Sequence, residues 1–191
     1  MVLFVIAHLA GLVPALLAPA SFEAYASALH HSALLPVVEL GLATNVVVHI
    51  GLTLTKTITN RLRGNDTPLN SRRQAPLAAL ASRSKLPAGV VTVVFLAIHL
   101  QQLRWPRPLD GGERAALQAV LDQPMSLLLY VTAAMALGLH LLHGAEAAHR
   151  SLGWLNPANG TTLRRGGRLI AAVIGGGFLL ISVGLAWGGV A

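Results

Sequence analysis

The chain has 191 residues, of which 54% are hydrophobic and only 11% are charged, and its mean hydropathy is +0.63. This balance excludes an ordinary soluble domain and indicates a membrane protein. The formal net charge of +7 does not indicate nucleic-acid binding, because the basic residues lie at helix ends and loops without interleaved aromatic residues. The chain has no cysteine, which excludes disulfides, thiolate metal sites and c-type haem attachment.

Five apolar runs without lysine or arginine have about the length of a membrane-spanning helix, since a hydrocarbon core about 30 Å thick takes roughly 20 residues. They cover residues 1–19, 33–55, 86–103, 124–148 and 169–190. We therefore predict one all-α domain over residues 1–191, an integral membrane bundle of five transmembrane helices. Small residues in the last helix permit close helix packing. No basic segment precedes the first run, so we expect no cleavable signal peptide.

The basic residues predict the orientation of the bundle. Seven of them lie between residues 56 and 85, and four lie between residues 150 and 168. The positive-inside rule places both connections in the cytoplasm, so the N-terminus lies inside and the C-terminus outside a bacterial or archaeal cytoplasmic membrane. The two outer connections cover residues 20–32 and 104–123, and the stretch ERAALQAVLD in the second has the pattern of a helix along the membrane interface.

Four histidines lie one in each of the first four predicted helices: His8, His49, His99 and His140. At 1.5 Å per residue, His49 and His140 lie roughly 24 Å below the outer ends of their helices, and His8 and His99 roughly 16 and 8 Å below theirs. An ionisable side chain in a membrane costs roughly 2.5 kcal/mol or more, so it usually faces protein, a cavity or a cofactor. Depth therefore pairs His8 with His99 in the outer half, and His49 with His140 in the inner half.

Each pair could hold a haem b between two axial imidazoles. Neutral imidazole binds haem iron, and two axial imidazoles saturate the metal, which favours electron transfer over oxygen binding. A bundle core is a common place for such a site. The pattern therefore predicts two stacked bis-histidine haems. The alternative for any one of these histidines is a hydrogen-bonded packing role, which is about as common.

Three other arrangements of the histidines compete with this prediction. His140 and His143 form H-x-x-H, but no acid completes an H-E-x-x-H zinc motif. Glu146 and His149 form one E-x-x-H, whereas a di-iron bundle needs two copies and further glutamates. His143, one turn from His140, is an alternative haem ligand, but we prefer His140 because it lies deeper.

Four stretches follow one another over about the first 157 residues: LFVIAHLAGL, FEAYASALHHSALLPVVELGLATNVVVHIGL, SRSKLPAGVVTVVFLAIHLQQLR and YVTAAMALGLHLLHGAEAAHRSLGWLNP. Together they resemble the cytochrome b subunit of succinate dehydrogenase and fumarate reductase, in its single-chain, five-helix, two-haem type. The resemblance implies that His8, His49, His99 and His140 are the haem ligands. It departs from the family at the short start before His8, and at Gly138, where some members carry a glutamate linked to transmembrane proton movement.

The resemblance also implies a function and partners. The chain would anchor a FAD-containing flavoprotein subunit, where succinate is oxidised, and an iron–sulfur subunit on the cytoplasmic face. Electrons would pass through the inner and then the outer haem to a quinone, often menaquinone, and fumarate reduction would be the reverse path. The rivals are a cytochrome b anchor of another dehydrogenase, such as a hydrogenase, and a haem-free transporter or assembly protein whose histidines relay protons or substrate.

Polar residues near the helix ends have less definite predictions. Arg83, with Ser82, could pair with haem propionates at the inner mouth of the third helix, or Arg83 could anchor that helix at the headgroups. Glu23, His30 and the neighbouring His31 could contact quinone from the outer connection, or could be solvated. Two further predictions are that Glu39 faces protein within the second helix, and that His149 lies at the membrane interface or contacts another subunit.

Overall fold

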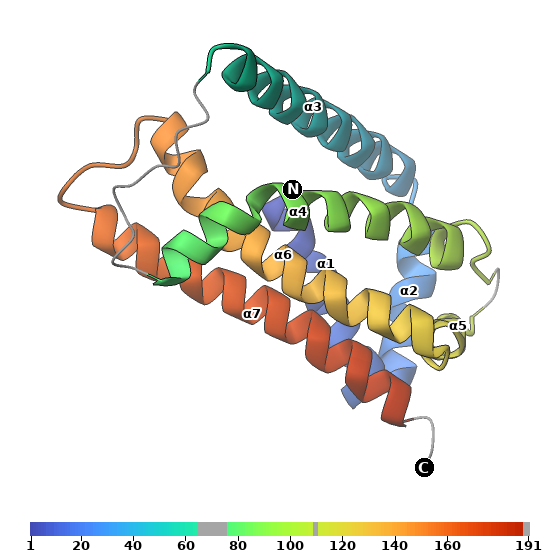
Figure 1. Cartoon of the computed structure of the whole chain (residues 1–191). Helices are drawn as coiled ribbons and strands as arrows, with labels where there is room; N and C mark the ends of the chain where they lie inside the picture. Colours follow the sequence, from blue (N-terminus) through green and yellow to red (C-terminus); the bar gives the residue numbers. More distant parts are fainter. Residues whose placement is uncertain (65–75, 109–110, 189–191) are drawn as a thin grey trace.

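The computed structural model of the chain describes residues 1–64, 76–108 and 111–188, and within these ranges helices are the only regular secondary structure (Figure 1). This confirms the predicted all-α class. The elements in chain order are α1 (Val2–Leu17), α2 (Pro19–His30), α3 (Leu35–Leu62), α4 (Pro76–His99), the π-helical turn η2 (Leu100–Arg104), α5 (Glu113–Leu121), α6 (Pro124–Ser151) and α7 (Gly160–Trp187).

Four helices in the described ranges are long and apolar enough to cross a membrane: Leu35–Leu62, Ser82–Arg104, Pro124–Ser151 and Gly160–Trp187. They correspond to the last four predicted spans, and they indicate a helical membrane protein. The first predicted span forms α1, which has 16 residues. That is shorter than the roughly 20 residues a span needs, so the count of five spans stays a prediction.

Prolines explain several helix boundaries. Pro19 disfavours a helical conformation at Ala18, whose φ of −152° and ψ of 72° end α1, and α2 then begins at Pro19. Most of the outer connection predicted at residues 20–32 is therefore helical rather than a loop. α4 begins at Pro76, ten residues before the predicted start at residue 86, and it continues through Pro87. The apolar run marks only the apolar part of a longer helix.

α6 packs along both α4 and α7 (Figure 1), and the buried hydrophobic core joins α6 and α7 to side chains from α1, α2 and α5. Small residues allow α6 and α7 to approach closely. A Cβ atom added at Gly175 of α7 would lie 3.1 Å from the carbonyl oxygen of Ala134 and 3.1 Å from Cα of Gly138, both on α6. Ile174 beside this contact, and Leu185 further along α7, are almost completely buried. The small residues of the last helix thus serve close packing, as expected.

The remaining helices differ in how closely they pack against the rest of the bundle. α1 packs against α2 and α7, and α5 packs against α2, α6 and α7. The helix predicted at ERAALQAVLD is present as α5, and its position along the membrane interface stays a prediction. In contrast, α3 stands apart from the other long helices (Figure 1), and none of its residues is buried.

Candidate functional site

The structure brings the four intramembrane histidines together in two pairs. His8 of α1 faces His99 at the end of α4, with ring centroids 6.1 Å apart and ring planes at 79°. His49 of α3 faces His140 of α6, with ring centroids 6.0 Å apart and ring planes at 81°. These are the pairs that helix depth predicts, and a ligand role for each ring stays a prediction.

The separation within each pair fits two imidazoles on one metal. A bond from a metal to an imidazole nitrogen is about 2.0 Å long, and the ring centre lies about 1 Å behind that nitrogen, so two trans imidazoles have their centres roughly 6 Å apart. Both pairs have this separation. Two neutral imidazoles also form the donor set that haem iron prefers for electron transfer. The residues present therefore fit a bis-histidine haem at each pair.

The His8 ring lies among aromatic side chains. Phe4, one turn earlier on α1, stacks on it with ring centroids 5.4 Å apart and planes at 11°. Phe178 of α7 lies 5.8 Å from the same ring at 38°. Aromatic rings at these distances pack against the imidazole and restrict its movement.

The His99 ring is fixed more closely still. Phe95, one turn earlier on α4, stacks on it at 5.3 Å, and Tyr130 of α6 meets the Phe95 ring edge to face at 4.9 Å. The Tyr130 hydroxyl lies 3.1 Å from Nδ1 of His99, within hydrogen-bond distance. Sequence analysis did not identify Tyr130, because its ten-residue separation from His140 on α6 gives no indication of a contact with α4.

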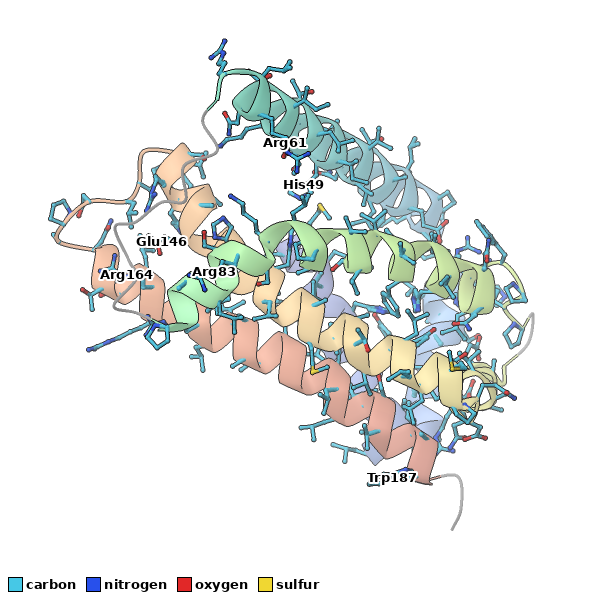
Figure 2. All side chains as sticks on the ribbon, viewed as in Figure 1. His49, Arg61, Arg83, Glu146, Arg164 and Trp187 are labelled. Atoms are coloured by element: carbon cyan, nitrogen blue, oxygen red, sulfur yellow. The ribbon has the colours of Figure 1, made fainter. Side chains whose placement is uncertain are left out.

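The inner pair has a less enclosed environment. His140 lies against Gly89 of α4, where an added Cβ would lie 3.5 Å from Cε1 and 3.6 Å from Nδ1 of the imidazole. Nδ1 of His140 is buried without a hydrogen-bond partner. His49 is exposed on α3 and projects toward the other helices (Figure 2). One ring therefore belongs to the packed bundle and the other to the helix that stands apart.

Three residues predicted near the inner ends of their helices differ in exposure. Ser82 is half-buried and Arg83 is exposed. Figure 2 shows Arg83 at the end of the bundle where Glu146 and Arg164 also lie. His143 is half-buried one turn beyond His140, and none of the ring contacts found in the described residues involves it. Pairing thus distinguishes His140 from His143.

Two residues of the predicted outer connection take part in helix contacts. The Glu23 carboxylate accepts hydrogen bonds from the backbone N–H groups of Gly112, Glu113 and Arg114, at 2.9–3.2 Å, and so caps the start of α5. A hydrogen bond with the Glu113 side chain, together with these N–H groups, lowers the pKa of Glu23. His30 Nδ1 lies 3.1 Å from the Glu113 carboxylate. Glu23 and His30 are therefore fold contacts rather than simply solvated groups.

Glu39 has a partner that sequence analysis left unknown. Arg104 donates to it through both nitrogens of a bidentate pair, at 2.6 and 2.8 Å, and thereby joins the outer end of α3 to the end of η2. The π-helical hydrogen bond from Trp105 N–H to the Leu100 carbonyl, 3.0 Å long, sets the direction of Arg104.

The described residues contain no group of three or more histidines, cysteines or acidic residues that could hold a metal ion. A bis-histidine haem needs only two protein ligands per iron, so the two pairs belong to a different class of site. No protein-family model, curated protein or solved structure matches the chain.

Proposed function

We propose that the chain is a di-haem cytochrome b, the membrane-anchor subunit of a succinate:quinone oxidoreductase. One observation supports the cytochrome: two histidine pairs, each drawn from two helices of an apolar bundle, have the ring separation of two ligands on one iron. The choice of this enzyme complex is supported by the sequence resemblance alone.

In this proposal His8 and His99 hold the outer haem, and His49 and His140 hold the inner one. A bis-histidine haem b supplies reversible one-electron chemistry at each pair. With a haem bound at each pair, the two histidines would leave no free position on the iron for oxygen, and the rings of Phe4, Phe95 and Phe178 pack around the outer pair. Arg83, exposed at the inner end of α4, is available for a haem carboxylate.

The partners follow from the predicted orientation. In the predicted orientation the inner pair lies toward the cytoplasm, where an iron–sulfur subunit would bind and would itself carry the flavoprotein subunit that oxidises succinate. The outer pair then lies toward the quinone, for which menaquinone is the first candidate. The catalytic oxidation of succinate takes place in the partner, and this chain contributes no catalytic residue to it.

The first experiment is haem quantification on the purified full chain. We expect a reduced-minus-oxidised spectrum of b-type haem and, by pyridine haemochrome assay, two haems per chain. His99→Ala and His140→Ala should each remove one haem, and the double variant both. His31→Ala is the matched control, because His31 is exposed and, among the described residues, its ring hydrogen-bonds only to the Ser27 carbonyl of the preceding helix. A folded chain without haem would overturn the proposal.

A second experiment tests the choice of complex. The tagged full-length chain is purified from its own membranes with its native partners. Copurification of a flavoprotein and an iron–sulfur subunit, with haem reduction by succinate, would support the proposal. Haem reduction by hydrogen but not by succinate would instead identify the anchor of a hydrogenase.

A further inference from the structure

We propose that Tyr130 is a positioning residue for the outer histidine pair. Its hydroxyl accepts a hydrogen bond from Nδ1 of His99, fixes which ring nitrogen carries the proton, and lowers the reduction potential of the haem that His99 holds. This inference rests on the proposed function, because it concerns a haem at that pair.

The geometry leaves the Tyr130 hydroxyl little freedom to move. The Tyr130 residue is only 7% exposed, and its ring meets the Phe95 ring at 4.9 Å and 89°. Phe95 in turn stacks on His99 at 5.3 Å. Three rings from α4 and α6 therefore hold one another, and the 3.1 Å separation of the hydroxyl from Nδ1 is fixed by this packing rather than by a mobile side chain.

The chemistry of imidazole gives this contact a consequence. A neutral imidazole has one N–H and one lone pair, and the partner of one nitrogen decides the state of the other. When Nδ1 of His99 donates its proton to the Tyr130 oxygen, the lone pair of Nε2 is free for iron. The hydrogen bond also makes the imidazole a more basic ligand, which stabilises ferric over ferrous iron and lowers the potential.

The other three histidines lack this kind of partner. Within the described ranges, Nδ1 of His140 is buried without a hydrogen-bond partner, and no side chain hydrogen-bonds to the ring of His8 or His49. Removing the Tyr130 hydroxyl should therefore affect one haem and spare the other. That asymmetry separates a specific effect on His99 from a general loosening of the bundle.

The test is Tyr130→Phe in the full chain, which keeps the packed ring and removes only the hydroxyl. We expect two haems per chain, with the higher potential confined to the haem that is missing from His99→Ala. If the hydrogen bond favours ferric iron tenfold, the rise is about 59 mV for one electron. The readouts are a spectroelectrochemical titration and the low-spin ferric electron paramagnetic resonance signals.

The matched control is Tyr25→Phe. Tyr25 is the only other tyrosine of the chain, it is 46% exposed, and its hydroxyl makes no hydrogen bond to the described residues. This variant should leave both potentials and both resonance signals unchanged.

The possible outcomes distinguish a failure of this inference from a failure of the proposed function. Two haems with unshifted potentials in Tyr130→Phe would overturn the inference and leave the cytochrome intact. Equal shifts of both potentials, or loss of both haems, would also overturn it. Loss of the outer haem alone at an unchanged melting temperature would support it. A wild-type chain without haem would overturn the proposed function and this inference together.

Discussion

The two histidine pairs have nearly the same ring separation but very different surroundings. Around His8 and His99, side chains from α1, α4, α6 and α7 form an aromatic cluster with a buried hydroxyl on one imidazole. Around His49 and His140, one ring lies in the packed bundle while the other belongs to a helix that buries no residue. The outer pair is held by the packing of the bundle, whereas the inner pair depends on the placement of one helix.

Gly175→Leu should have the largest effect, which is a larger separation between the two histidines of the outer pair. The new side chain would meet the backbone of α6 at positions where even a Cβ lies at 3.1 Å, and overpacking of this kind costs about 3 kcal/mol. It would push α7 away together with α1, and so separate His8 from His99. Spin labels at Ala10 of α1 and Val93 of α4 should show a longer and broader distance distribution, since the chain has no native cysteine to interfere.

Gly176→Leu is the matched control, because a Cβ at this neighbouring glycine meets nothing within 4 Å. A label distance that stays the same in both variants would contradict the view that α6–α7 packing holds the outer pair. The inner pair, formed by α3 and α6, should keep its spacing in either variant.

A smaller effect, on the inner pair, is expected from Arg104→Met. This change removes the bidentate pair with Glu39, which is half-exposed and therefore contributes about 1 kcal/mol. Since α3 buries no residue, its position should become less defined. Labels at Leu52 of α3 and Met135 of α6 should show a broader distribution, while the labels on α1 and α4 should not change.

Arg150→Met is the control for that variant, because Arg150 pairs with Glu146 only four residues away on the same helix. It should leave the separation of α3 from α6 unchanged. A narrow, wild-type distribution in Arg104→Met would show that the ion pair does not place α3.

The smallest expected effect concerns the capping of the start of α5 by Glu23. The pKa of Glu23 is lowered from its ordinary value of 4.5, so the carboxylate stabilises the fold above that pH, and the contribution is lost as the pH falls through the lower folded value. Glu23→Gln should cost about 0.5 kcal/mol near neutral pH, and this cost should shrink as the pH is lowered below 4.5. Thermal unfolding of both proteins at each pH measures this; a cost that persists in acid would contradict it.

The sequence predicts the long helices well but their ends poorly. The start of α6 was predicted correctly at residue 124, because Pro124 begins both the apolar run and the helix. α7 instead begins at Gly160, nine residues before its apolar run, since polar residues at a helix end continue the backbone hydrogen bonds outside the apolar layer. α2 was missed because its sequence has neither a long apolar run nor strong periodicity.

The candidate site shows a similar limit. Depth along each helix was enough to predict which histidines lie together, because side chains of two helices in a bundle can meet only if they lie at the same level. Depth could not identify Tyr130, or Arg104 as the partner of Glu39, because both contacts depend on which way a helix is rotated. Rotation is set by packing that a single sequence does not reveal.

The π-helical turn η2 makes the function of this region sensitive to the length of the chain as well as to its composition. A π turn holds one residue more than an α turn, and each residue of a helix advances it by about 100°. Inserting one more residue between Leu100 and Arg104 would keep His99 in place but rotate everything after the insertion by about 100°, because the turn already holds the extra residue that a π turn can absorb. Arg104 would then point away from Glu39, and a one-codon insertion would break the ion pair that joins α3 to η2 without altering any of the four histidines.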